Sequence, residues 1–131
     1  MSVRLFTSNF WVMSRRTDAG VPVRISNGRP KYALAYSLVY KVPALFPAWS
    51  LVRGASRERF RREYFAALDD VGVEALREVF EAIAKEAGDN RLVLLCFENL
   101  TKPGVWCHRE LFAEWWQERT GEVVEEVALT P

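Results

Sequence analysis

The sequence RLVLLCFE at residues 91–98 is the clearest sign of the fold in this chain. Residues 92–97 form a continuous apolar run of strand length, without the alternation of polar and apolar residues that marks a strand with one face in water. Such a strand is buried on both faces, and strands of this kind occur in parallel sheets that helices cover on either side. The run therefore predicts a central strand of an α/β sheet.

Helices flank this strand in the sequence. A helix capped by Ser56 is expected to end near residue 70, and a second is expected over residues 73–87, with Gly88 as its C-terminal stop. After the strand, a third helix is expected over residues 107–120. In each helix apolar residues recur every three or four positions, as they do on a buried helix face.

The remaining segments complete the predicted sheet. Residues 3–6 predict a strand that runs into a polar loop, and residues 21–26 predict a second strand between turn-forming residues. Residues 31–53 are interpreted as a short helix or an extended segment followed by a loop, and a closing strand is expected within residues 123–129. Helices between strands favour a single α/β domain over residues 1–131, with a small, mainly parallel sheet covered by helices on both faces in three layers.

Length and composition agree with one folded domain and exclude other classes. The chain has 131 residues, of which 50% are hydrophobic and 27% are charged, and this is too apolar for an intrinsically disordered protein. Its apolar stretches fall short of the roughly 18 residues that a membrane span needs, so no membrane partner is expected. With two cysteines and no visible export signal, the sequence predicts a soluble protein of the reducing cytoplasm.

Charge is distributed unevenly along the chain. Residues 1–62 carry twelve basic and two acidic residues, whereas residues 63–131 carry six basic and fifteen acidic residues. The two halves either neutralise each other on folding or leave a basic surface for a phosphate, a nucleotide or a nucleic acid. Four arginines early in the helix after Ser56 would make the nucleic-acid contact, unless they pair with acids of the C-terminal half. They are Arg57, Arg59, Arg61 and Arg62.

Polar and ionisable residues follow the predicted strands, and the carboxyl ends of parallel strands would bring them together. In open α/β sheets, ligands bind at that edge. Arginines there would bind an anion, and small polar side chains would orient it. The residues expected to bind a small anionic ligand, such as a nucleotide or a phosphate-bearing metabolite, are Thr7, Ser8, Asn9, Arg24, Ser26, Arg29, Cys96 and Arg109.

The triplet Cys107, His108 and Arg109 opens the third predicted helix. A helix N-terminus favours negative charge, so it would bind an anion and would make the Cys107 thiol more acidic. A thiol-dependent enzyme is therefore the alternative to a binding module. In that enzyme Cys107 is the nucleophile, His108 carries the proton, and Glu98 orients His108 or Arg109. A third interpretation is purely structural, with a buried Cys107, a capping His108 and a pair between Arg109 and Glu98. Because all three interpretations remain open, the sequence does not decide whether the chain is an enzyme.

Neither a metal nor a cofactor is expected. Cys96, Glu98, Cys107 and His108 are of ligand types, but no CxxC pair is present, and neighbouring Cys and His side chains are expected to point in different directions from a helix start. Cys96 and Cys107 could also approach closely enough for a reversible disulfide. The sequence contains no indication of the oligomeric state.

The order of these motifs resembles that of a known family. LLCFE at 94–98, CHR at 107–109 and Trp115 in the following helix are similar to the signature of the domain of unknown function family 488. The resemblance covers most of the chain, and its Cys-x-Glu and Cys-His-Arg steps are the specific ones. Weaker steps occur in the same order as in the short members of the family, namely TSNF at 7–10, RIS at 24–26, Pro30, LFP at 45–47, Gly54, Phe60 and Tyr64.

The resemblance implies a compact α/β domain of a bacterial, archaeal or phage cytoplasm, in which the Cys-x-Glu and Cys-His-Arg residues line one pocket. It implies no particular reaction. Longer relatives have an Asp-Val-Arg step in the second strand, where Val23, Arg24 and Ile25 stand here. No role of that acid is therefore carried over to this chain.

Overall fold

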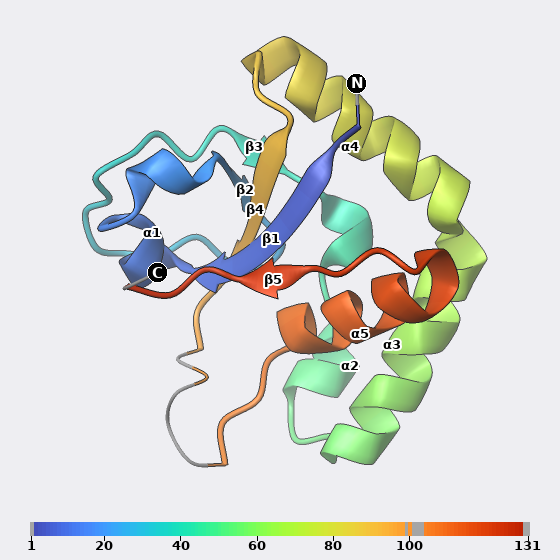
Figure 1. The fold of residues 1–131 in the computed structure, drawn as a ribbon. Coiled ribbons are helices and arrows are strands. Elements are labelled where there is room, and N and C mark those ends of the chain that lie inside the picture. Colours follow the sequence, from blue (N-terminus) through green and yellow to red (C-terminus); the bar gives the residue numbers. More distant parts are fainter. Residues whose placement is uncertain (1, 99, 101–103, 130–131) are drawn as a thin grey trace.

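The computed structural model describes residues 2–98, 100 and 104–129 (Figure 1). Its strands form one five-stranded sheet in the order β3-β2-β4-β1-β5, and every neighbouring pair is parallel. The predicted α/β class with a mainly parallel sheet is confirmed. The strands are β1 (Arg4–Asn9), β2 (Val21–Arg24), β3 (Tyr40–Lys41), β4 (Arg91–Cys96) and β5 (Glu125–Glu126).

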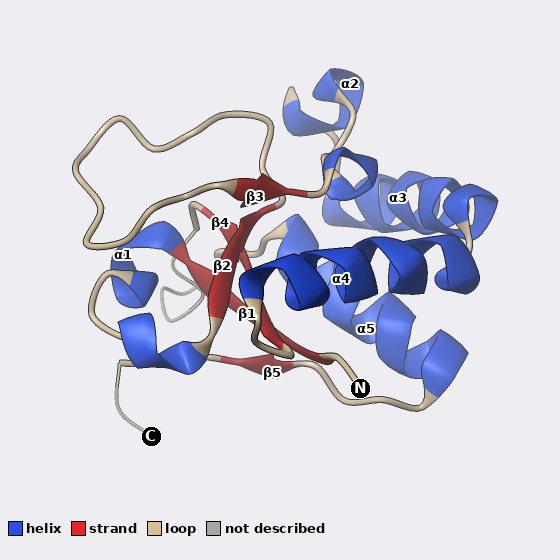
Figure 2. Ribbon diagram, turned by 90° about the horizontal axis from the view of Figure 1, so that it is seen from above, coloured by secondary structure: helices blue, strands red, loops and turns tan. Residues whose placement is uncertain are grey.

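Helices lie on both sides of the sheet (Figure 2). The long helices α3, α4 and α5 cover one face and carry the larger core cluster, whereas the short α1 lies on the other face over a smaller cluster. Short 3-10 turns, η1 (Thr17–Ala19) and η2 (Pro43–Leu45), occur in the connections. The helices are α1 (Phe10–Met13), α2 (Trp49–Val52), α3 (Arg57–Val71), α4 (Val73–Ala87) and α5 (His108–Thr120).

β4 is the central strand that its apolar run predicts. It lies between β2 and β1, and residues 92–96 are all buried. Leu92 and Leu94 belong to the larger core cluster, whereas Val93 and Leu95 belong to the cluster on the opposite face. Because both faces of β4 are covered, successive side chains can all be apolar, and this explains the absence of alternation.

The three long helices match their predicted bounds closely. Ser56 Oγ accepts a hydrogen bond from the backbone N–H of Arg59 at 3.1 Å and thereby caps α3. α4 spans residues 73–87, as predicted, and is followed by Gly88 in the left-handed conformation (φ 72°). α5 begins at His108, with Cys107 as its N-cap residue. No helix in the described part of the chain is long and apolar enough to cross a membrane.

The predicted polar loop after the first strand is wrong. Thr7, Ser8 and Asn9 belong to β1, where they pair with residues 94–96 of β4. Their polar side chains are tolerated in a buried strand because each is hydrogen-bonded: Thr7 donates to Glu126, Ser8 donates to the Val127 carbonyl, and the Asn9 side chain caps α1. The sequence shows that these residues are polar, but it does not show which groups will accept or donate their hydrogen bonds.

Residues 31–53 hold the other corrections. Of the two alternatives for the start of this segment, the short helix is wrong: tyrosine recurs every four residues at 32, 36 and 40, but residues 31–39, all of them described, form no helix. The extended alternative holds at Tyr40, which is in β3. The Tyr36 hydroxyl instead donates to the Phe10 carbonyl at 3.1 Å, so this tyrosine holds a long loop against α1. The ends of the sheet also differ, because β2 stops at Arg24 and β5 comprises only Glu125–Glu126.

Candidate functional site

A cavity of about 330 Å³ lies at the carboxyl ends of β2 and β4. Two of its walls come from the segment that contains α2 and from the start of α3, including Trp49 and Phe60. Trp106 also lines it and packs edge to face on Phe60, with ring centroids 5.0 Å apart. The predicted site residues that line the cavity are Ser26, Cys96, Glu98, Cys107 and His108. The rule that ligands bind at strand carboxyl ends therefore locates the cavity correctly.

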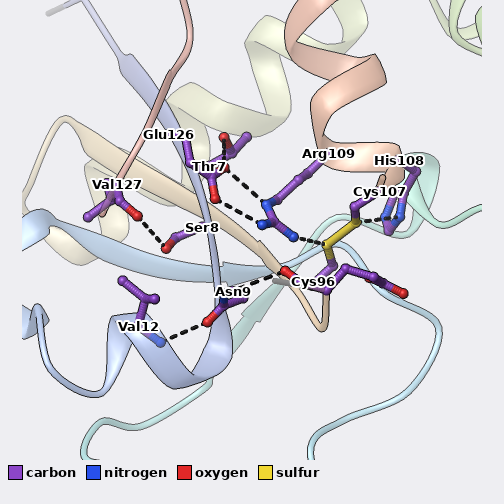
Figure 3. Close-up of polar contacts among 11 residues, drawn as sticks. Thr7, Ser8, Asn9, Val12, Cys96, Cys107, His108, Arg109, Glu126 and Val127 are labelled. Carbon is purple, nitrogen blue, oxygen red and sulfur yellow. Dashed lines mark hydrogen bonds and ion pairs between the residues drawn. A yellow bond between two sulfur atoms is a disulfide. The ribbon is translucent and has the colours of Figure 1, made fainter. Parts of the chain in front are cut away.

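The two cysteines of the chain meet beside this cavity. Cys96 is the last residue of β4 and Cys107 is the N-cap of α5, and the structure joins them in a disulfide (Figure 3). Only 1% of Cys96 and 3% of Cys107 is exposed. Both sulfurs are thus sheltered from bulk water, and access to them is through the cavity that the two residues line.

His108 is held in a single protonation form by its neighbours. Its Nε2 lies 2.7 Å from the Ile25 carbonyl oxygen, which can only accept a hydrogen bond, so Nε2 carries the hydrogen. Nδ1 is then an unprotonated acceptor, and it lies 3.5 Å from Cys107 Sγ. Burial lowers the pKa of His108 to about 4, so the imidazole is neutral at pH 7. The ring therefore presents a lone pair to the sulfur.

Arg109 is completely buried and connects the second sulfur to β5. Its Nη1 donates to Cys96 Sγ at 2.9 Å, and its Nε and Nη2 donate to the two carboxylate oxygens of Glu126 at 3.0 and 2.9 Å. Thr7 Oγ1 also donates to Glu126, at 2.7 Å (Figure 3). The predicted pair of Arg109 with Glu98 is wrong, because the partner is Glu126 on the edge strand.

Two glutamates of the site differ from what the sequence predicts. Glu98 is exposed at the cavity, and its backbone carbonyl lies 3.5 Å from Asn9 Nδ2. His108 is oriented by the Ile25 carbonyl rather than by Glu98. Glu126 was missed as a site residue because nothing local distinguishes it from the neighbouring Glu125. Only the pairing of β5 with β1 brings Glu126 next to Arg109.

The other residues expected to bind an anion are engaged within the protein. Arg24 Nη1 donates to the carbonyls of Ser26 and Asn27 at 2.7 and 2.9 Å, and Arg29 donates to the Leu38 carbonyl at 3.0 Å. Thr7, Ser8 and Asn9 are not among the residues that line the cavity. Of the predicted anion ligands, only Ser26 and Cys96 line it.

The arginines at the start of α3 meet acids of the C-terminal half, as one of the two interpretations expects. Arg57 pairs with Glu110 at 3.2 Å, and Arg61 pairs with Glu114 at 2.6 Å. Arg59 pairs within its own helix, with Glu63 at 2.5 Å, and Arg62 is exposed. These pairs neutralise much of the charge that would attract a nucleic acid to this helix.

Cys107 and His108 do not point in different directions, so that expectation is wrong. Cys107 precedes the helix in an extended conformation (φ −142°, ψ 152°), and its Sγ lies beside the imidazole of the first helical residue. One ligating atom from each of Cys96, Cys107 and His108 lies within 4.8 Å of the others. These residues, all buried, could hold a soft metal ion.

The buried imidazole predicts that the stability of the disulfide form depends on pH. Histidine in the unfolded chain has a pKa of 6.5, whereas burial, assisted by the charge of Arg109, lowers the pKa of folded His108 to about 4. Between these two values the unfolded chain binds more protons than the folded protein. The free energy of unfolding is therefore expected to fall by about 3 kcal/mol as the pH drops through this window, with most of the contribution retained above pH 6.5.

The matched control is His108→Gln, whose side-chain amide can still donate to the Ile25 carbonyl but does not titrate. Asp69 and Asp89 also have pKa values lowered by their arginine partners. The parent protein and the His108→Gln variant therefore both become less stable in acid. Urea unfolding at pH 7 and pH 4 is the measurement, and the His108 contribution is the difference between the two losses. Equal losses in the two proteins would contradict it.

Comparisons with protein-family models, curated proteins and solved structures find no match to this chain. The chemistry of the site itself therefore indicates the function. That site is a cavity with two adjacent sulfurs, a neutral imidazole directed at one of them and a guanidinium donating to the other.

Proposed function

We propose that this protein is a thiol–disulfide exchange enzyme that acts on small disulfides. The observation that carries the proposal is the arrangement around the sulfur pair: His108 Nδ1 lies 3.5 Å from Cys107 Sγ, and Arg109 Nη1 lies 2.9 Å from Cys96 Sγ. This is the thiol-dependent alternative of the sequence analysis. It is favoured over an anion-binding module because the arginines expected to bind the anion donate to the protein's own carbonyls and to Glu126.

In the reduced protein, Cys107 is the attacking thiol. As Cys107 attacks, its proton moves to Nδ1 of His108. The negative charge that develops on the sulfur stabilises the imidazolium beside it, and it is itself stabilised by the N-terminal end of α5. The thiolate attacks one sulfur of a bound disulfide, RSSR, and a mixed disulfide between Cys107 and RS forms. The other half leaves as a thiolate and takes the proton from His108. This step releases one thiol and leaves the imidazole neutral again.

Cys96 completes the reaction. The hydrogen bond from Arg109 favours the thiolate form of Cys96, whose proton passes to water. This thiolate attacks Cys107 Sγ and breaks its bond to the substrate sulfur, and the second half of the substrate leaves as a thiolate that takes up a proton from water. The substrate disulfide is reduced by two electrons, and the two cysteines are oxidised to the Cys96–Cys107 disulfide. Low-molecular-weight thiols of the cell regenerate the dithiol by the reverse exchange. His108 and Arg109 thus each serve one sulfur.

The cavity limits the substrate class. Its volume of about 330 Å³ is at the lower end of ligand pockets, and aromatic side chains of Trp49, Phe60 and Trp106 line it. A small disulfide with an apolar or aromatic substituent matches such walls better than a highly charged one. Among the described residues that line it, Glu98 is the one with a formal charge at neutral pH, and it is acidic, so these residues offer an anionic substrate no attraction.

A single-turnover reaction with the neutral aromatic disulfide 4,4′-dithiodipyridine tests the proposal. The reduced protein is expected to release two thiopyridone molecules and to end with its own cysteines joined. Cys96→Ser should release one and remain as a mixed disulfide of defined mass. Cys107→Ser should release at most one, and much more slowly, because Cys96 has no imidazole beside its sulfur. His108→Gln should slow the first release by at least about tenfold, because it lacks the proton acceptor.

Melting curves of the variants serve as the folding control. The proposal fails if Cys107→Ser reacts as fast as the parent protein, or if Cys96→Ser also releases two thiols. It likewise fails if the parent protein binds two thiopyridyl groups and forms no internal disulfide. Each result would show that the two sulfurs do not act as an attacking and a resolving pair.

A further inference from the structure

The geometry points to a second capacity of these side chains: in the dithiol state, Cys96, Cys107 and His108 form a binding site for a zinc ion. The chain contains two cysteines and one histidine in total, and all three meet at one point. This inference goes beyond the proposed function, because metal binding does not require exchange activity. It reverses the expectation from the sequence that no metal is bound.

One separation between donor atoms already fits a tetrahedral ion, and the two sulfurs, which are joined in the disulfide form, must separate on reduction. One ligating atom from each residue lies within 4.8 Å of the others, and Cys107 Sγ lies 3.5 Å from His108 Nδ1. With bond lengths of about 2.3 Å to sulfur and about 2.0 Å to nitrogen, a tetrahedral zinc ion separates a sulfur and a nitrogen ligand by about 3.5 Å. The Cys107 and His108 side chains already have this separation.

The backbone leaves room for the ion between the two cysteines. Their Cα atoms are 7.7 Å apart in the disulfide form. Reduction breaks the sulfur–sulfur bond, and rotation of the two side chains then separates the thiolates. Cys96 ends the first of these elements and Cys107 caps the second, so both are anchored on regular structure.

Neighbouring groups orient these ligands in the way that outer contacts do in metal sites. The Ile25 carbonyl accepts from His108 Nε2 at 2.7 Å and so keeps Nδ1 free for a metal. Arg109 donates to Cys96 Sγ, and it is itself neutralised by Glu126. Two thiolates, a neutral imidazole and a divalent ion add up to no net charge, so burial of the centre leaves no uncompensated charge.

The ligand types select the metal. Thiolate and imidazole suit zinc, whereas calcium and magnesium require oxygen ligands. Three protein ligands leave a fourth position, which would face the cavity that all three residues line, as in zinc sites that keep one position for water or substrate. Binding releases the two thiol protons, and the bound thiolates cannot form a disulfide until the ion leaves, so zinc competes with exchange.

Titration of the reduced full-length protein with Co²⁺ under anaerobic conditions tests the site. We expect one ion per chain, with sulfur-to-metal absorption in the near ultraviolet and the visible bands of tetrahedral cobalt, both removed by a stoichiometric addition of Zn²⁺. Zn²⁺ should also raise the melting temperature of the reduced protein. The same protein with its disulfide intact is the matched control and should bind neither ion.

Three variants identify the ligands. Cys96→Ser and Cys107→Ser should abolish the sulfur-to-metal absorption, and His108→Gln, which retains a donor for Ile25, should weaken Zn²⁺ binding by at least about tenfold. The inference is overturned if the reduced protein binds these ions no better than the disulfide form. It is also overturned if His108→Gln binds Zn²⁺ as tightly as the parent, because the two thiols alone would then account for binding.

Exchange is measured separately, in the presence of a chelator. If the parent protein reduces the disulfide but does not bind Zn²⁺ or Co²⁺, the metal site is refuted and the proposed function is not. If it binds the metal but does not reduce the disulfide, the proposed function is refuted and the metal site is not.

Discussion

Replacement of Glu126 by alanine is expected to lower the free energy of unfolding by about 3 kcal/mol, which corresponds to roughly 10 °C in melting temperature. This is the lower end of the range for breaking a buried ion pair, because 37% of the Glu126 side chain is exposed and water screens its charge. Arg109 has no exposed surface, and Glu126 accepts two of the three hydrogen bonds that its guanidinium donates. Without this carboxylate a buried cation has no counter-charge, and Thr7 also loses its acceptor. Removal of Glu126 costs more than the net contribution of the pair, because the charge of Arg109 is fully buried and stays desolvated, although Glu126 itself is partly exposed.

Glu125→Ala is the control for this substitution. Glu125 is the neighbouring residue of β5 and is also exposed, so it should change the free energy of unfolding by less than about 0.5 kcal/mol. Urea unfolding of both variants in the same buffer gives the comparison. Similar stabilities for the two variants would mean that water or Cys96 accepts the hydrogen bonds of Arg109 when Glu126 is absent. The pair between Arg109 and Glu126 would then not stabilise the contact of β5 with α5.

Replacement of Gly20 by alanine is expected to lower the free energy of unfolding by about 4 kcal/mol. Gly20 has φ 148°, which side chains rarely permit, and a Cβ there would lie 2.6 Å from the Arg91 carbonyl oxygen and 2.9 Å from Arg91 Cβ. Backbone strain and overpacking each contribute roughly 1 to 3 kcal/mol. The affected atoms lie where the chain before β2 passes the start of β4, so the change separates two neighbouring strands.

Gly28→Ala is the matched control for backbone freedom. Gly28 has no positive φ that restricts side chains, and a Cβ there would meet no atom within 4 Å. This variant should therefore be as stable as the parent protein or slightly more stable, because alanine reduces the freedom of the unfolded chain. If Gly20→Ala melts at the same temperature as Gly28→Ala, the close approach of Gly20 to Arg91 is not a constraint on the fold.

Local patterns were sufficient for most of the secondary structure. The apolar run of β4, the Ser56 cap of α3 and the bounds of α4 were all predicted, because strand burial, capping and helical periodicity depend on residues close in sequence. The failures have a common cause. Thr7 to Asn9 look like a loop until their hydrogen-bond partners on β5 and α1 are known, and Tyr32 to Tyr40 have helical spacing without forming a helix.

The location of the two cysteines was predicted from the sequence, but the hydrogen-bond and ion-pair partners of His108 and Arg109 were not. Cys96 and the start of the helix at Cys107 were expected at one edge of the sheet, because the ends of parallel strands meet there. The side chains of Cys107 and His108, however, were expected to point in different directions, whereas the structure brings them together with Cys96. The partners that set their chemistry are remote in sequence: the Ile25 carbonyl fixes the His108 tautomer, and Glu126 neutralises Arg109.

Residue types and spacing thus already contain the α/β class and the location of Cys96 and Cys107 at one edge of the sheet, since both follow from short-range periodicity and from the general geometry of parallel sheets. The roles of Glu126 and Ile25, and the use of Arg24, Arg29 and Arg109 inside the protein, depend on which strand lies beside which. That order results from the packing of the whole core, and residues that are far apart in the chain have no local signal of their later contact.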